Sequence, residues 1–215
     1  MVSGEKERWI LILAIDTTSG SSAAVVNLGE VLGFSVFDDP FGHAENIGQA
    51  IESALSEAKI TVSEIEAVAI SRGPASYTGL RVGVAAGLTF ATAREIPLKG
   101  VVSLDAVASI HGAGFAEENW LVTSDAKRGE RFVGIYSGLN DVGLAIREEQ
   151  LQVMKPEDLE NAFGSLPRIS EPCDARAVGV YAEKAAAAGI KLDDLSALYL
   201  RSPDVTPSSK KRVSG

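Results

Sequence analysis

A carboxylate followed by hydroxyl side chains is the first group of residues in this sequence that could do chemistry. Asp16 ends an apolar run that starts at Trp9, and Thr17, Thr18 and Ser19 follow it. A carboxylate at a strand end can hold Mg²⁺ through water, and backbone N–H groups of such a turn can wrap a phosphate. The ordinary alternative is a polar hairpin turn with an aspartate-capped bend. This stretch alone leaves both interpretations open.

A similar arrangement returns in the second half of the chain. An apolar run begins at Trp120 and ends in Asp125, a turn covers 126–129, and another strand is expected over 131–136. Two such aspartate hairpins facing each other across a cleft are typical of actin-like and sugar-kinase ATPases. The repeated pattern therefore favours two similar units, each opening with a strand, an aspartate, a short turn and an antiparallel partner strand.

A glycine-rich segment, SRGPASYTG, precedes an expected helix over 77–93. It lacks the Lys-Ser or Lys-Thr pair of a Walker loop, because Leu80 and Arg81 follow its last glycine. Within the helix, Gly79, Gly83 and Gly87 are four residues apart and so share one face. Each glycine costs the helix about 0.8–1 kcal/mol relative to alanine, which predicts a compensating close contact. That contact is either an interface with a partner chain or close packing inside the same domain.

The remaining candidate residues for catalysis or metal binding are isolated. His43 and His111 have no His or Cys four residues away, and Cys173 has Arg176 as its only positive neighbour in sequence. No G-x-S-x-G motif supports hydrolase chemistry. One cysteine and two histidines allow at most one zinc site, which would need carboxylates to complete it. We therefore interpret Cys173 as structural.

Composition excludes several classes of protein. The 215 residues include 46% apolar residues, enough to bury a sizeable core, and 20 Lys and Arg against 29 Asp and Glu give a net charge of −9. This acidity argues against a protein that grips bare nucleic acid by itself, although Lys127, Arg128 and Arg131 form a local basic strip. The apolar run over 9–15 is too short to span a membrane, and MVSGEKER is no secretory segment. We expect a cytoplasmic protein.

The periodicity of apolar residues predicts alternating strands and helices. A helix that begins at Ser103 is expected to be capped by that residue, the glycine-rich stretch 111–115 is a joint, and 174–188 is an alanine-rich helix. We expect an N-terminal lobe over 9–111, a C-terminal lobe over 112–207, and flexible ends at 1–8 and 208–215. The other expected strands cover 9–15, 23–28, 31–37, 67–70, 98–102 and 143–147, and the other expected helices cover 44–59 and a short segment from 156.

Several segments together resemble the bacterial TsaB (YeaZ) family. They are ILAIDTTSGSSAAVV, HAEN at the start of a helix, SRGPASYTGLRVGVAAGLTFA, IPLKGVVSLDAVA, SDAKRGERFVGIY and LYLRSPDVTP. The resemblance covers about residues 10–207, and its most specific part is the GPxSxTGLRxG pattern between Gly73 and Gly83. It implies an α/β fold of the actin-like (ASKHA, ribonuclease-H-like) type, with two lobes that are each built on a mixed sheet with helices.

The resemblance also implies a function. TsaB-like proteins are non-catalytic subunits in the synthesis of threonylcarbamoyladenosine next to the anticodon of tRNA. They pair with the paralogue TsaD, which carries the metal and transfers the threonylcarbamoyl group, and act with the ATPase TsaE. By this resemblance the aspartate hairpins are a vestigial phosphate loop made of Asp16, Thr17, Thr18, Ser19 and Asp125. We expect no cofactor, at most weak nucleotide binding, and contact with tRNA only inside the complex.

The family's dimer surface is formed by the first two helices of the N-terminal lobe, used for self-pairing or for TsaD. On this chain the surface would lie on helices over 43–59 and 77–93. The expected interface residues are His43, Ile47, Ile51, Gly79, Leu80, Val82, Gly83 and Gly87.

The catalytic paralogue carries an H-x-x-x-H metal pair after its own GLRxG helix. Through the shared PLxGVxxL pattern, those positions fall on Ser103 and Val107, neither of which supplies an imidazole. The resemblance therefore predicts a scaffold that is not an enzyme. The alternative is an enzyme, either a metal-dependent (glycoprotease-like) peptidase or a small ATPase that uses Asp16 and Asp125.

Overall fold

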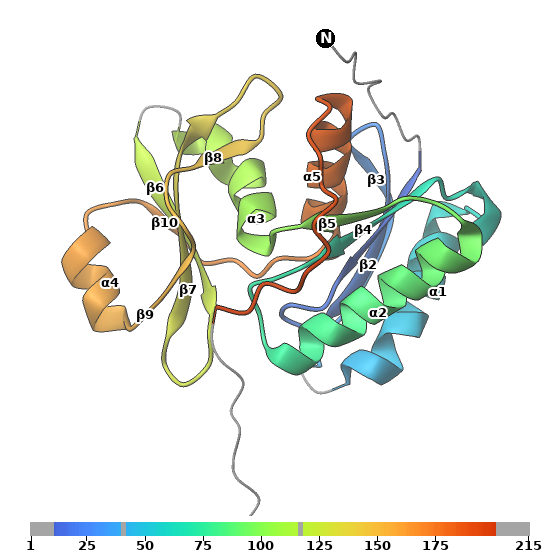
Figure 1. Cartoon of the computed structure of the whole chain (residues 1–215), viewed down its shortest axis with the longest axis horizontal. Helices are drawn as coiled ribbons and strands as arrows, with labels where there is room; N and C mark the ends of the chain where they lie inside the picture. The colour runs from blue at the N-terminus through green and yellow to red at the C-terminus, as the bar shows by residue number, and fades with distance from the viewer. Residues whose placement is uncertain (1–10, 40–41, 116–117, 201–215) are drawn as a thin grey trace, which may run out of the picture.

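A computed structural model describes residues 11–39, 42–115 and 118–200 of the chain, which form two sheets with helices around them (Figure 1). The expected flexible ends 1–8 and 208–215, and the expected strand start at Trp9, lie outside the described residues. None of the described helices has both the length and the apolar character needed to cross a membrane.

The first sheet has the strand order β3-β2-β1-β4-β5. Its first three strands form an antiparallel meander, while β4 and β5 run parallel to β1. The strands are β1 (Ile12–Asp16), β2 (Ser21–Asn27), β3 (Glu30–Phe37), β4 (Ala67–Ser71) and β5 (Leu98–Val101).

The apolar run of β1 is buried on both faces of the sheet, as a near-continuous apolar strand predicts. Successive side chains point to opposite faces. Leu13 and Ile15 therefore pack with helices α1 (His43–Ala58) and α2 (Tyr77–Arg94), whereas Ile12 and Ala14 face helix α5 (Ala175–Ala187) on the other side (Figure 1). A short 3-10 turn, Val62–Glu64, connects α1 to β4.

The second sheet has the order β10-β6-β7-β8, and β9 also pairs with β7. One face packs on α4 through Leu121, Val133 and Leu159, and the other packs towards α3 through Trp120 and Tyr136. These elements are β6 (Asn119–Asp125), β7 (Arg131–Leu139), β8 (Ala145–Arg147), β9 (Gln152–Met154), β10 (Arg168–Ile169), α3 (Ser103–His111), the 3-10 turn Gly112–Phe115 and α4 (Pro156–Phe163).

Both lobes are thus mixed sheets covered by helices, and the predicted α/β fold with two lobes, each built on a mixed sheet with helices, is confirmed. In the first lobe, a meander is followed by parallel strands added next to β1, so the aspartate end of β1 lies at the same edge as the end of β4. Each lobe opens with a hairpin, β1–β2 in the first and β6–β7 in the second.

Helix α5 differs from the expected division at residue 112. It lies within 112–207 in sequence, yet it packs on β1 and β2 of the first sheet. Gly179 allows this approach, because a Cβ there would lie 2.5 Å from Val26 Cγ2 and 3.1 Å from Ala14 Cβ. The chain therefore returns to the first lobe after the second sheet. The expected cap also differs, since Val102 precedes the first turn of α3 and Ser103 is its first residue.

Helix α3 connects the lobes. It packs on α5 and on the second sheet, and its Asp105 accepts a hydrogen bond from Tyr136 Oη at 2.9 Å and pairs with Arg147 at 3.5 Å. Burial raises the pKa of Asp105, and the Arg147 charge and the Tyr136 hydroxyl partly oppose that rise. This network fixes α3 to the second sheet.

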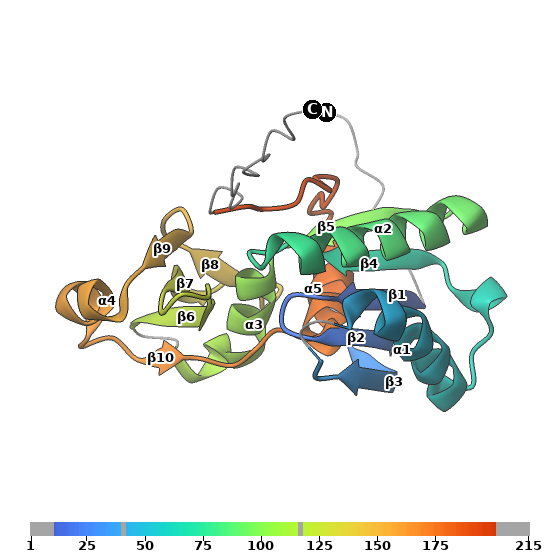
Figure 2. The same cartoon turned by 90° about the horizontal axis from the view of Figure 1, so that it is seen from below.

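The segment that follows α5 runs along the free edge of β5 and returns to the start of α2 (Figure 2). Gly100 donates its N–H to Leu192 O at 2.9 Å, and Leu198 donates its N–H to Arg72 O at 2.7 Å. Two ion pairs flank these bonds, Lys99 with Asp193 at 2.9 Å and Arg72 with Asp194 at 2.7 Å. We call residues 192–200 the C-terminal strap.

The glycine face of α2 packs against its own sheet. Gly79, Gly83 and Gly87 are all buried. A Cβ on Gly79 would lie 2.6 Å from Thr17 O, and a Cβ on Gly83 or Gly87 would collide with the side chain of Thr17 or Ile70. The glycine spacing therefore reflects close packing inside the domain, which is one of the two interpretations of the sequence.

This packing predicts opposite effects for two Gly-to-Ala changes. Gly83→Ala is expected to lower the free energy of unfolding by about 2 kcal/mol, because the new methyl group overpacks against Thr17. Gly48→Ala, inside α1 with open space around its Cβ, is expected to raise it by about 0.5–1 kcal/mol through helix propensity. Urea denaturation followed by circular dichroism measures both. A stabilised Gly83→Ala would contradict the packing.

Candidate functional site

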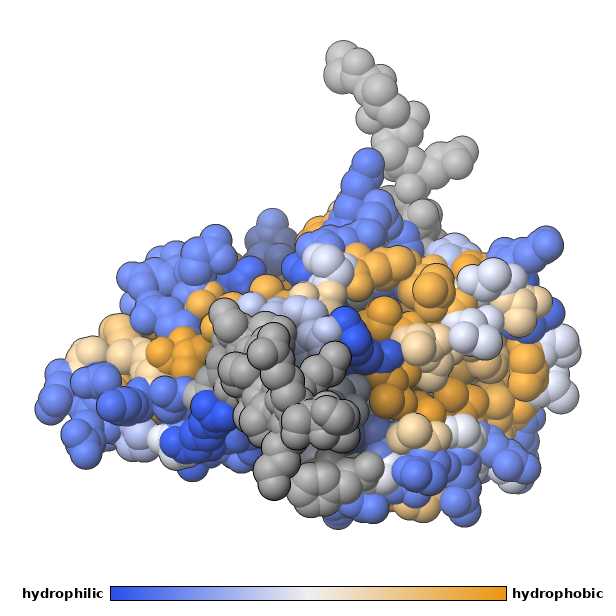
Figure 3. Space-filling view, turned by 60° about the horizontal axis from the view of Figure 1, so that its bottom comes forward, coloured by the Kyte–Doolittle hydropathy of each residue, from blue (hydrophilic) through white to orange (hydrophobic). Residues whose placement is uncertain are grey.

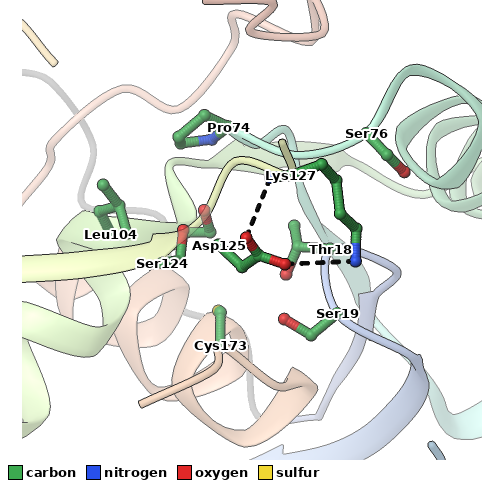
Figure 4. Close-up of a pocket in the computed structure, with 10 residues that line it drawn as sticks. Thr18, Ser19, Pro74, Ser76, Leu104, Ser124, Asp125, Lys127 and Cys173 are labelled. Carbon is green, nitrogen blue, oxygen red and sulfur yellow. Dashed lines mark hydrogen bonds and ion pairs between the residues drawn. The ribbon is translucent and has the colours of Figure 1, made fainter. Parts of the chain in front are cut away.

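Two hairpins, one from each lobe, meet at a pocket of about 210 Å³ (Figure 4). The β1–β2 turn supplies Thr18 and Ser19, and the end of β6 with its turn supplies Ser124, Asp125 and Lys127. The rest of the lining comes from the loop before α2, the first turn of α3 and the residue two positions before α5; these residues are Pro74, Ser76, Ser103, Leu104 and Cys173. The pocket is thus rich in hydroxyl groups.

Asp16 is buried at the end of β1 and does not line this pocket. Its side chain is buried, and Thr18 donates both its N–H and its hydroxyl to the carboxylate at 3.0–3.2 Å. Burial raises the pKa of Asp16 from 3.8 to about 7, more than the bonds from Thr18 lower it, and the nearby charge of Asp174 adds to the rise. Asp16 is therefore partly protonated at neutral pH.

Asp125 has the opposite environment. Its side chain is exposed and pairs with Lys127 Nζ at 3.4 Å, and it accepts the Lys127 N–H at 3.0 Å. Lys127 and Arg128 have φ values of 63° and 54°, so the turn bends sharply. The lysine of the pocket lining is thus already paired with a carboxylate. Of the basic strip expected from the sequence, only Lys127 lines this pocket; Arg128 and Arg131 are not among its lining residues.

Thr17 takes no part in the pocket lining. It is buried and donates its hydroxyl to Gly79 O at 2.8 Å, which fastens the β1–β2 turn to the first turn of α2. Among the residues of the expected phosphate loop, Thr18, Ser19 and Asp125 therefore reach one pocket, whereas Thr17 is buried in the interior and the buried Asp16 lines a second pocket. Thr17 is a packing residue because its hydroxyl is used inside the fold.

A second pocket of about 240 Å³ lies on the other side of Ser19 and Cys173. Its walls include Asp16, Phe34, Asp38 and Arg176. Arg176 forms an ion pair with Asp174, whose side chain also caps α5. Burial and the carboxylates of Asp16 and Asp174 raise the pKa of the Cys173 thiol well above its usual value, so the thiol stays protonated.

Sequence reasoning missed both the second pocket and the place of Cys173 between the two. Neither Pro172 nor Cys173 carries a local motif. Asp174 is the only nearby sequence signal. It stands at the expected start of α5, where it acts as the N-cap, so it marks the end of the loop that holds Cys173.

The two positions at which the resemblance predicted the loss of a metal pair lie on α3. Ser103 is buried at the first turn and lines the first pocket, and Val107 packs in the apolar core one turn later. Within the described part of the chain, no three His, Cys, Asp or Glu side chains form a group that could hold a metal ion. The two histidines lie elsewhere: His43 is bonded to Ser21 at 3.2 Å, and His111 pairs with Glu171 at 3.1 Å.

The expected partner interface needs correction. Ile51 and Val82 are half-buried and reach the surface of the helix pair. The other six residues expected at the interface are buried inside the fold, so they are not available to a partner; they are His43, Ile47, Gly79, Leu80, Gly83 and Gly87. The glycine spacing correctly indicated that α2 makes a close contact. However, the glycine face packs inside the domain and is not the exposed face of the helix.

The opposite face of α2 is exposed and apolar in part. Leu88 is 51% exposed, Ala85 is exposed, and Val84 is half-buried beside them. Figure 3 shows apolar residues gathered over the side of the molecule where α1 and α2 lie. Gly48 on α1 is exposed and has open space around its Cβ.

Comparisons with known proteins agree with this fold. The family model described as TsaD, tRNA N6-adenosine threonylcarbamoyltransferase, matches residues 41–171. An uncharacterized protein of Mycobacterium tuberculosis is 34% identical over 211 residues, covering 91% of this chain and 94% of that protein. The tRNA threonylcarbamoyladenosine biosynthesis protein TsaB of Escherichia coli is 32% identical over 147 residues, covering 68% of this chain and 63% of that protein. The structure of YeaZ from Pseudomonas aeruginosa superposes with a TM-score of 0.73 at 22% identity, covering 88% of this chain and 99% of that one.

The buried Asp16 predicts a pH dependence of stability. Because its pKa is higher in the folded chain than in the unfolded one, the folded state holds the proton more tightly between pH 4 and 7. Asp16 therefore makes the free energy of unfolding fall as pH rises through this window, by at most about 4 kcal/mol.

Asp16→Asn is expected to remove this contribution, so the variant gains stability relative to the parent as pH rises from about 4 to about 7. Chemical denaturation at a series of pH values measures the difference. Asp125→Asn, at an exposed carboxylate of the neighbouring pocket, is the control and is expected to leave the slope unchanged. Parallel pH profiles for the parent and Asp16→Asn would show that Asp16 ionises normally.

Proposed function

This chain belongs to the TsaB (YeaZ) family, and from that premise we propose that it is a non-catalytic subunit in threonylcarbamoyladenosine synthesis on tRNA. In this role it pairs with a TsaD-like enzyme, which transfers the threonylcarbamoyl group to the adenosine next to the anticodon, and acts with a TsaE-like ATPase. The chain holds the enzyme in an active conformation by binding that conformation better than others. The site of action is the cytoplasm.

The observation that carries this proposal is the exposed apolar face of α2 beside α1. Leu88 leaves half of its surface in water on a helix whose other face is already packed on the sheet. An apolar helical face of this kind gains stability when a partner helix covers it. The same face binds a TsaD-like subunit or a second copy of this chain, because a paralogue of the same fold has helices equivalent to α1 and α2.

The hydroxyl-rich pocket supports the non-catalytic part of the proposal. Asp16 is desolvated and partly protonated, and Asp125 is neutralised by Lys127. The volume of about 210 Å³ is below the range of about 300–1,000 Å³ that is usual for ligand sites. A triphosphate would find little uncompensated positive charge there, so nucleotide binding by the isolated chain is weak and without turnover.

The second candidate function is a small ATPase of the actin-like superfamily. It is favoured by the meeting of the two hairpins, which brings Thr18, Ser19 and Asp125 to one pocket. Calorimetric titration with ATP and Mg²⁺ distinguishes the two. Micromolar affinity with turnover, lost in Asp125→Asn, would replace the scaffold by the ATPase.

Pairing is expected to depend on the exposed face of α2. Leu88→Lys is expected to weaken binding to the TsaD-like subunit at least tenfold, because it places a charge in an apolar contact. Ile110→Lys is the matched control, since Ile110 is 50% exposed on α3, which packs on α5 and the second sheet. Isothermal titration calorimetry measures both variants. If both variants lose affinity equally, or if neither loses affinity, the interface lies elsewhere.

The activity itself is tested by reconstitution with TsaD-like and TsaE-like subunits and tRNA. Omitting this chain is expected to abolish formation of threonylcarbamoyladenosine, detected by mass spectrometry of nucleosides, and Leu88→Lys is expected to reduce it in proportion to lost pairing. Full modification without the chain would contradict the scaffold role.

A further inference from the structure

Two exposed tyrosines lie against each other where the C-terminal strap reaches α2. Tyr77, the first residue of α2, is 38% exposed, and Tyr199 of the strap is 37% exposed. Their ring centroids are 4.9 Å apart with 34° between the planes. The other aromatic side chains of the described residues are buried or half-buried, so exposed aromatic surface is concentrated at this one place.

An arginine extends the same stack. Arg81, one turn along α2 from Tyr77, has its Cζ 3.9 Å from the centroid of the Tyr77 ring. Arg81 is exposed and makes no ion pair within the described part of the chain. Arg81, Tyr77 and Tyr199 thus form a column that ends in a cation without a carboxylate, which we call the tyrosine–arginine column.

The positive charge of the column is that of Arg81, whose guanidinium lies over the exposed Tyr77 ring. Positive charge next to exposed aromatic rings is the combination that binds single-stranded nucleic acid, through phosphate contacts and base stacking.

We propose that the tyrosine–arginine column is a stacking site for an unpaired base of RNA. This inference rests on the proposed function, in which the substrate modified by the partner enzyme is a tRNA, and it deepens that function by assigning the chain its own contact with a single-stranded loop. Unstacked loop bases are recognised by stacking on aromatic rings or on guanidinium planes, and the column presents one of each. The column lies outside both pockets and outside the hydroxyl-rich hairpins.

The observations favour RNA over a protein partner because of charge. Tyrosine and arginine are also frequent at protein interfaces, and the column adjoins the partner face of α2. An anchor buried in a protein contact would leave Arg81 desolvated without a carboxylate on this chain to balance it, whereas a phosphate backbone supplies the negative charge. A protein contact is therefore a separate outcome of the test below.

The test measures binding of a fluorescein-labelled anticodon stem–loop RNA to the assembly of this chain with its TsaD-like partner, by fluorescence anisotropy at several salt concentrations. Tyr199→Ala is expected to weaken binding about tenfold, since one stacked base contributes about 1–3 kcal/mol. Tyr199→Phe keeps the ring and is expected to stay within about twofold of the parent. Arg81→Ala leaves the strap intact and is expected to weaken binding and to flatten the salt dependence.

Two controls accompany the binding measurements. Thermal melting of each variant confirms that the strap remains folded, and Ile110→Ala reports the effect of losing an exposed apolar side chain elsewhere. Unchanged RNA affinity in both Tyr199→Ala and Arg81→Ala would overturn the inference. Weaker pairing with the enzyme in calorimetry, with unchanged RNA affinity, would also overturn it and assign the column to a protein contact.

A separate measurement on the isolated chain distinguishes failure of the column from failure of the proposed function. If the chain does not pair with the TsaD-like subunit, the RNA is titrated against the isolated chain at low salt. Affinity that Tyr199→Ala reduces and Tyr199→Phe retains then supports the column without the scaffold, and affinity unaffected by Tyr199→Ala and Arg81→Ala overturns it.

Discussion

Helix α2 lies against the end of β1 at a distance that only glycine permits, and the rest of the molecule is arranged around that contact. Gly83 has no Cβ to collide with Thr17, and Thr17 uses the approach to donate its hydroxyl to Gly79 O. The bond joins residues 62 positions apart and is buried. It fixes the β1–β2 turn and the start of α2 as one unit, so displacement of either moves the other.

This contact decides which side chains are available for function. With the small-residue face of α2 turned inward, the larger residues of the helix, Leu88 and Arg81 among them, are presented to solvent. The same contact draws Thr17 inward and leaves Thr18 and Ser19 at the pocket. Asp16, at the end of β1, is desolvated by burial, and the bonds from Thr18 offset only part of that cost. A carboxylate in this state is poorly suited to binding a cation, which agrees with the proposed scaffold role.

The sequence predicted the elements well because the signals for them are local. The apolar run ending at Asp16 gave a strand buried on both faces, and the helix expected over 77–93 is found at Tyr77–Arg94. The two aspartate hairpins were recognisable because strand, acid and turn follow each other in sequence. The direction of the glycine face was not predictable, since a spacing of four residues places glycines on one side of a helix but does not say what covers that side.

The features that sequence reasoning missed depend on contacts between distant segments. The amphipathic pattern of α5 indicates that the helix packs on a sheet, but it does not indicate which sheet. In the structure α5 packs on the first sheet, where Gly179 permits a close approach. That return to the first lobe carries the C-terminal strap along β5, where ion pairs of Lys99 and Arg72 hold it, and brings Tyr199 onto Tyr77. No local motif predicts a ring stacked on another 122 positions away. The exposed column at the start of α2 is thus a consequence of chain topology, in the same way that the buried glycine face is a consequence of the contact with Thr17.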